Sequence, residues 1–105
     1  MSVRVSVLYP AGNGKRFDHT YYAGKHMPMA GQLLGARYEV DRGVGGGMPG
    51  APAPYEAACH FWFDTVADYE RAIGNAAPRL MADIPNYTDI TPIIQVSEVV
   101  SRSNP

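Results

Sequence analysis

The chain has 105 residues, of which 46% are hydrophobic and 18% are charged, and its formal net charge is −1. This length and composition predict one folded domain that spans residues 1–105. The nine basic residues are scattered along the chain, so its charge gives no electrostatic reason to expect nucleic acid or an anionic membrane as a partner.

Further features of the sequence exclude several kinds of site. The single cysteine, Cys59, rules out an internal disulfide and a Cys-x-x-Cys metal site, and the three histidines show no spacing of a known metal site. No apolar run is long enough to span a bilayer. The first residues, MSVRVSVLY, lack the charged and continuously apolar regions of a signal peptide, so we expect a cytoplasmic protein without a metal.

The first third of the chain predicts a strand followed by a helix. Alternation over Val3–Tyr9 is typical of a strand, and Pro10 ends it. Asp18 is a suitable N-cap for a helix over about residues 19–34, which Gly35 ends. One face of this helix would carry Tyr22, His26, Ala30 and Leu33.

A proline disturbs this helix. Pro28 lacks the N–H that would bond the carbonyl of residue 24, and its ring pushes against that carbonyl. Residue 24 is glycine, which tolerates an adjusted backbone. We therefore expect a kink or break between Gly24 and Pro28, with His26 in the middle of it.

The middle of the chain predicts two strands joined by a long loop. The second strand covers residues 37–44, with charges at alternate positions, and the third is Tyr55–Phe63, which is apolar on both faces. Between them lies a Gly/Pro-rich segment, GVGGGMPGAPAP, which is long for a plain connection. This segment is either a mobile hairpin or a lid or dimer arm.

The last third predicts a helix and a final strand. Asp64 or Thr65 would cap a helix over about residues 66–75, and Pro78 would begin a short separate helical segment that Pro85 ends. Residues 91–100 alternate as the fourth strand. The order β-α-β-β-α-β predicts an α+β, ferredoxin-like fold, in which both helices cover one face of a four-stranded antiparallel sheet.

Two helices cover only one face of such a sheet, yet the third strand is apolar on both. Cys59 is expected on the helix-facing side as an inert core thiol. Because soluble monomers seldom expose large apolar patches, we expect a homodimer in which a second copy packs against the other face and closes a barrel. That face would carry Ser6, Leu8, His60 and Trp62.

Three stretches of the sequence together resemble the EthD family of the dimeric α+β barrel group. They are FDHTYYAGKHMP (residues 17–28), HFWFDTVADYERA (60–72) and ADIPNYTDITPIIQVSEV (82–99). The resemblance implies a dimeric α+β barrel and a family whose members are often labelled reductases. GVGGGMPG follows a strand, but no helix follows it, so it is not a nicotinamide fingerprint and we expect no bound cofactor.

Two histidines are candidate catalytic residues. His26 matches the family's His-x-Pro pattern, and a histidine titrates near neutral pH. The alternative for His26 is a structural bond to a free carbonyl near Pro28. His60 would face the barrel interior beside Trp62 and contact a substrate there, or it would be satisfied across the dimer interface.

Other candidates would bind the substrate. Tyr22 shares the helix face of His26, although core packing would also explain it. Asp83 and Tyr87 lie in the family-like DIPNYTD stretch. This stretch is either a tight turn whose side chains bond backbone amides, or a place where a carboxylate supports a histidine.

These residues suggest a small dimeric enzyme that is associated with oxidation chemistry or transfers protons. Its substrate would be a small apolar or aromatic organic metabolite of a catabolic pathway. His26 would be the general acid or base, with His60 and Tyr22 orienting the substrate. The alternative is a non-catalytic protein that binds small molecules or serves an oxidation system as an accessory.

Overall fold

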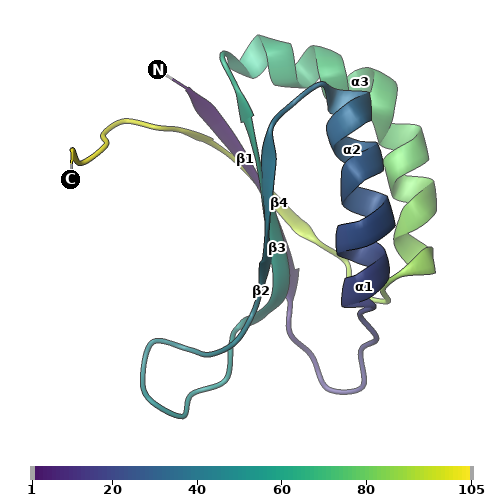
Figure 1. Cartoon of the computed structure of the whole chain (residues 1–105), viewed down its shortest axis with the longest axis vertical. Coiled ribbons are helices and arrows are strands. Elements are labelled where there is room, and N and C mark those ends of the chain that lie inside the picture. Colours follow the sequence, from purple (N-terminus) through teal and green to yellow (C-terminus); the bar gives the residue numbers. More distant parts are fainter. Residues whose placement is uncertain (1, 105) are drawn as a thin grey trace.

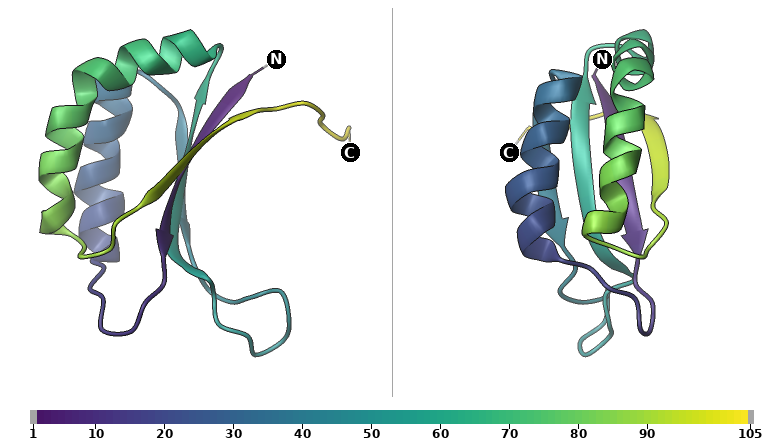
Figure 2. Two further views of the ribbon diagram at one scale, coloured as in Figure 1. Left: turned by 180° about the vertical axis from the view of Figure 1, so that it is seen from behind. Right: turned by 90° about the vertical axis from the view of Figure 1, so that its right-hand side faces the viewer.

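The computed structural model describes residues 2–104, which form one four-stranded sheet and one layer of helices. All strands are antiparallel, in the order β2-β3-β1-β4. The helices lie against one face and leave the other open, as Figures 1 and 2 show. This is the predicted ferredoxin-like α+β fold. Its elements are β1 (Val3–Pro10), α1 (His19–Tyr21), η1 (Tyr22–His26), α2 (Met27–Leu34), β2 (Tyr38–Arg42), β3 (Tyr55–Phe63), α3 (Val66–Asp83), η2 (Ile84–Asn86) and β4 (Ile93–Glu98).

The segments α1, η1 and α2 form one continuous helical stretch with a π-turn at its centre. In η1 the backbone N–H of Met27 bonds the carbonyl of Tyr22, five residues earlier. Pro28 follows directly and has no N–H to offer to Gly24. The expected kink or break is therefore a change of hydrogen-bond register, which the chain passes without interruption.

The helix α3 contradicts the prediction of two separate segments. It runs from Val66 to Asp83 as one helix and contains Pro78. Pro78 has no N–H to bond the carbonyl of Gly74, four residues earlier, and its ring crowds that carbonyl. Figure 1 shows the helix bending along its length, so the proline bends it and does not end it. Neither α3 nor any other described helix is long and apolar enough to cross a membrane.

The ends of the elements follow the predicted capping residues. Asp18 accepts a hydrogen bond from the backbone N–H of Tyr21 at 3.0 Å, and Thr65 accepts one from that of Asp68 at 3.0 Å. Gly35 ends α2 with a φ of 62°. The strands β2 and β4 are shorter than predicted, at residues 38–42 and 93–98.

The Gly/Pro-rich loop projects from one end of the sheet, between β2 and β3 (Figure 1). Hydrogen bonds within it join the N–H of Gly46 to the carbonyl of Ala51 at 2.9 Å, and the N–H of Ala51 to the carbonyl of Met48 at 3.0 Å. Met48 and Val44 are exposed. Internal bonds thus give the loop a defined shape, and its role as a lid or dimer arm stays a prediction.

The core lies between the sheet and the helices. Cys59 is buried on the helix-facing side, as predicted. An aromatic cluster surrounds the end of β1, where the ring of Tyr9 meets those of Phe17 and Tyr22 edge-on at 5.2 and 5.4 Å. Tyr87 completes the cluster, with its ring 5.0 Å from that of Tyr22. These aromatic contacts fix the end of the sheet at which the candidate site lies.

The open face of the sheet is more polar than predicted. The register pairs Ser6 with His60, and His60 with Glu39 on its other side. His60 also contacts Asp41, so polar side chains cross the middle of this face. Its exposed apolar members include Ile93, which is 52% exposed. The expectation of a mainly apolar face is therefore wrong, while its burial by a second copy stays a prediction.

Candidate active site

A cavity of about 230 Å³ lies between the helix-facing side of the sheet and the helices α2 and α3. Tyr9, His26, Cys59 and Tyr69 are the polar or titratable side chains of a lining that is otherwise apolar. Ligand sites commonly combine a concave apolar lining with a few placed polar groups. The strands contribute Val5, Val7, Tyr9, Cys59, Phe61 and Ile94, and the helical segments contribute His26, Met27, Ala30, Leu34, Tyr69, Ile73, Ala77, Leu80, Met81 and Ile84.

Four side chains form a chain of hydrogen bonds that ends at this cavity. Oδ2 of Asp83 lies 2.9 Å from Nδ1 of His26, and Nε2 of His26 lies 3.3 Å from the hydroxyl oxygen of Tyr87. The hydroxyl oxygens of Tyr87 and Tyr9 are 2.6 Å apart. We call this chain of Asp83, His26, Tyr87 and Tyr9 the relay. It connects a carboxylate behind His26 with a phenol on the cavity wall.

Burial keeps the imidazole and the two phenols of the relay uncharged. It lowers the pKa of His26 below its ordinary value although the hydrogen bond to Asp83 opposes this, so the imidazole is neutral at neutral pH. Its proton then lies on Nδ1 towards Asp83, and Nε2 accepts the hydroxyl proton of Tyr87. Burial also raises the pKa of Tyr87, and that of Tyr9 to about 12. Both phenols are therefore protonated.

The carboxylate of Asp83 is held in place by the turn that follows α3. Its Oδ1 accepts hydrogen bonds from the hydroxyl of Tyr21 at 2.8 Å and from Nδ2 of Asn86 at 2.9 Å, which leaves Oδ2 for His26. Burial alone would raise the pKa of Asp83, but the hydrogen bonds from His26, Asn86 and Tyr21 outweigh it and lower that pKa. Asp83 thus stays ionised beside a neutral imidazole.

The structure brings three of the sequence-predicted residues together. His26, Asp83 and Tyr87 belong to the relay, and Asp83 supports a histidine, which was one of its two predicted roles. Tyr22 stacks on His26 with 5.7 Å between ring centroids, but it is fully buried and does not line the cavity. Its hydroxyl has no hydrogen-bond partner within residues 2–104. Tyr22 therefore packs in the core beside the site.

His60 lies on the opposite face of the sheet, so within one chain it does not share a site with His26. Its Nδ1 lies 2.8 Å from Oγ of Ser6, and its Nε2 lies 3.0 Å from Oδ2 of Asp41. The sequence of contacts from Ser6 through His60 to Asp41 matches a nucleophilic triad. Ser6, however, lies in the central strand β1, which pairs with β3 and β4, so the backbone N–H groups that would stabilise an oxyanion are used in the sheet. The contacts satisfy His60 within its own chain.

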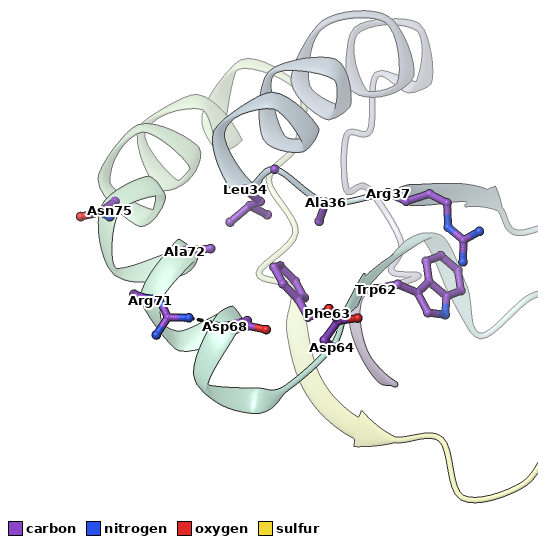
Figure 3. Close-up of a pocket in the computed structure, with 11 residues that line it drawn as sticks. Leu34, Ala36, Arg37, Trp62, Phe63, Asp64, Asp68, Arg71, Ala72 and Asn75 are labelled. Atoms are coloured by element: carbon purple, nitrogen blue, oxygen red, sulfur yellow. Dashed lines mark hydrogen bonds and ion pairs between the residues drawn. The ribbon is translucent and has the colours of Figure 1, made fainter. Parts of the chain in front are cut away.

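Trp62 borders a second cleft, of about 580 Å³, where α2 ends and α3 begins (Figure 3). The guanidinium of Arg37 lies over its indole ring, 5.2 Å from the ring centroid, and Arg71 pairs with Asp68 one turn earlier on α3. This cleft is larger than the cavity, but it is open and charged, and of the cavity lining it includes only Leu34. Trp62 is therefore far from the relay.

Sequence reasoning missed Tyr9, Tyr21 and Asn86. Alternation places Tyr9 on the helix-facing side, but nothing local indicates that its hydroxyl meets Tyr87, 78 positions later. Within the described residues 2–104, no three His, Cys, Asp or Glu side chains are grouped to hold a metal ion.

Comparisons with known proteins identify the family of the chain. Residues 12–91 match the EthD domain family, while no curated protein matches. An EthD-like protein from Ralstonia eutropha JMP134 shares 41% identity at a TM-score of 0.90, over 97% of this chain and 95% of that one. An EthD family protein from Bacillus halodurans C-125 shares the fold at 21% identity and a TM-score of 0.64, over 94% of this chain and 100% of that one. A Dabb family protein with a ferredoxin-like fold from Mesorhizobium loti MAFF303099 shares it at 14% identity and a TM-score of 0.57, over 95% of this chain and 98% of that one. The chain therefore belongs to the EthD family.

Proposed function

We propose that the cavity binds a small, largely apolar organic molecule and that the relay transfers a proton to or from it. The observation that carries this proposal is the continuous chain of hydrogen bonds from the ionised Asp83 to Tyr9 on the cavity wall. The volume of about 230 Å³ lies below the range of about 300–1,000 Å³ typical of drug-sized ligands, which favours a small substrate.

In this mechanism His26 is the base. A substrate hydroxyl gives its proton to the oxygen of Tyr9, Tyr9 gives its own to Tyr87, and Tyr87 gives its own to Nε2 of His26. Both phenols end protonated, and the imidazole becomes an imidazolium. The substrate is an anion only transiently, because the proton returns through the same chain to a second atom of the substrate. Asp83 stabilises the imidazolium through Nδ1. The reverse sequence makes the same residues a general acid.

A specific observation favours a second candidate function, binding without turnover. Every polar group of the relay is already satisfied by another member of the relay or by the turn after α3. Such a network also serves a rigid binding protein. Association with an oxidation system and a catabolic role stay predictions of the family resemblance, and a cytoplasmic location stays a prediction from the first residues of the sequence.

The homodimer is part of the same proposal. The open sheet face has no helix over it, and the edge strand β4 exposes Ile93 there. A second copy would cover this face and bury Ile93, with a two-fold axis as the expected symmetry. Sedimentation equilibrium measures this directly, and a monomer at high protein concentration would contradict it.

Ligand binding and two histidine variants test the proposed function. Small phenols, quinones, aldehydes and lactones are added to the purified protein, and a ligand that binds only the folded state raises the melting temperature. Each ligand found is then assayed for turnover. His26→Ala should abolish turnover, whereas His60→Ala, on the opposite sheet face, should retain it.

Each outcome of this experiment decides between the functions. Full activity of His26→Ala would refute the relay as the catalytic group. A ligand that binds but is never altered would favour the non-catalytic function. Circular dichroism of both variants checks that they remain folded.

A further inference from the structure

We propose that the cavity accepts only uncharged molecules, and that a bound phenol keeps its proton there at a pH at which the free phenol has lost it. The ligand class would be neutral hydroxyl or carbonyl compounds, to the exclusion of carboxylates, phosphates and amines. This inference rests on the proposed function of the site and extends it to the charge of the ligand.

The first observation is the composition of the cavity wall. Among the described residues, no lysine or arginine lines the cavity. Arg37 and Arg71 border the separate open cleft. An ionised ligand would lose its water without gaining a cation, and burying an unpaired charge is strongly unfavourable.

The second observation is the position of Asp83, the carboxylate of the relay. Asp83 is ionised and lies directly behind His26, so its field disfavours an anion held against the imidazole. It does not line the cavity, and its two oxygens are occupied by His26, Tyr21 and Asn86. It therefore offers no contact to a bound cation either.

The third observation is that burial raises the pKa of the acidic side chains that line the cavity. Burial raises the pKa of Cys59 to about 11 and that of Tyr9 to about 12. Burial raises the pKa of Tyr69 as well. A bound phenol would share this environment. The titratable side chains that face such a ligand are Tyr9 from β1, His26 from η1, Cys59 from β3 and Tyr69 from α3, with Asp83 behind His26.

If the bound ligand is uncharged, the number of reactions that the site can perform is limited. A proton taken from one atom of the ligand has to be matched by a proton given to another, so that no charge builds up in the apolar cavity. Tyr9 borders the cavity and is joined through Tyr87 to His26, so the relay can take a proton from one atom of the ligand and return it to another through Tyr9. Keto–enol interconversion has this balance, because one bond to hydrogen breaks as another forms.

Three nitroaromatic probes of similar size test the inference on the wild-type protein. 4-Nitrobenzyl alcohol is neutral at every pH used, 4-nitrobenzoate is anionic throughout, and 4-nitrophenol ionises near neutral pH with a change of absorbance. Binding is measured by calorimetry and by the spectrum of 4-nitrophenol, at pH values on both sides of its ionisation. Ala30→Leu, which fills part of the cavity, locates the binding site because Ala30 is a buried lining residue.

We expect the alcohol to bind with little dependence on pH and the benzoate to bind at least about 100-fold more weakly. Bound 4-nitrophenol should show the spectrum of the phenol at a pH where free 4-nitrophenol is phenolate, and Ala30→Leu should weaken all binding. A bound phenolate, or equal affinity for the benzoate, would overturn the inference and leave the proposed function standing. If none of the probes binds, both the inference and the proposed function fail for aromatic ligands.

Discussion

Tyr22 and Tyr87 form a matched pair for measuring what the relay contributes to stability. Both side chains are fully buried, and their rings lie 5.0 Å apart in one aromatic cluster. The hydroxyl of Tyr87 lies 2.6 Å from that of Tyr9 and 3.3 Å from Nε2 of His26. The hydroxyl of Tyr22 has no partner among the described residues. Replacing each tyrosine by phenylalanine removes the same atom from two different environments.

We expect Tyr87→Phe to lower the free energy of unfolding and Tyr22→Phe not to lower it. Tyr87→Phe leaves the hydroxyl of Tyr9 and Nε2 of His26 unpaired, and each such buried group costs about 1–3 kcal/mol. Because the 3.3 Å contact is long and belongs at the lower end, we expect a loss of about 2–4 kcal/mol in the free energy of unfolding. Tyr22→Phe removes a buried hydroxyl that gains no hydrogen bond, so that free energy should stay unchanged or rise by up to ~1 kcal/mol.

Urea denaturation measures both variants, at one fixed protomer concentration because association would otherwise change the apparent stability. The double variant Tyr9→Phe/Tyr87→Phe adds an internal test. Removing both partners should cost less than the sum of the single changes by about 1 kcal/mol or more. If Tyr22→Phe destabilised the protein as much as Tyr87→Phe, or if the two changes in the double variant were additive, the hydrogen bonds of the relay would not be the cause.

Two further predictions concern pH and a glycine of α2. Because burial lowers the pKa of folded His26, the unfolded chain binds more protons, and this contribution to stability, present above about pH 6.5, is lost as the pH falls through the folded pKa. The lowered pKa of Asp83 acts in the same direction below about pH 4. Urea titrations at a series of pH values should therefore show stability falling in two steps on acidification. The step at higher pH, which belongs to His26, should be absent in His26→Gln. Gly31→Ala should destabilise the fold by about 1–3 kcal/mol, because its Cβ would lie 2.6 Å from the ring of Tyr38. Gly74→Ala, in open space on α3, should gain up to about 1 kcal/mol, and equal effects of the two in thermal unfolding would contradict this reasoning.

Strand alternation was sufficient to predict the two faces of the sheet. Side chains of a strand alternate with a period of two, so Cys59 and His60 must lie on opposite sides whatever the register. Alternation could not predict the neighbours of His60, because Ser6 and Asp41 come from two other strands whose register depends on the complete sheet. The polar character of the open face therefore escaped prediction.

The relay could be predicted only in part, because its members are distant in the sequence. His26 and Asp83 are 57 positions apart, and Tyr9 and Tyr87 are 78 positions apart. The DIPNYTD stretch does bring Asp83, Asn86 and Tyr87 into one turn, and this is local information that a sequence contains. Which histidine that turn meets depends on how α2 and α3 pack against each other, which no local pattern determines.

The two internal prolines show how one local pattern yields two structures with different consequences for the site. Each proline follows a glycine by four residues, at Gly24–Pro28 and at Gly74–Pro78. The second pair only bends α3, whereas the first accompanies the π-turn. A π-turn contains one additional residue, so every side chain beyond it is rotated relative to a regular helix. That rotation explains why Leu34, and not the predicted Leu33, is buried and lines the cavity. The disturbance at Pro28 therefore helps to decide both where His26 lies and which side chains line the cavity.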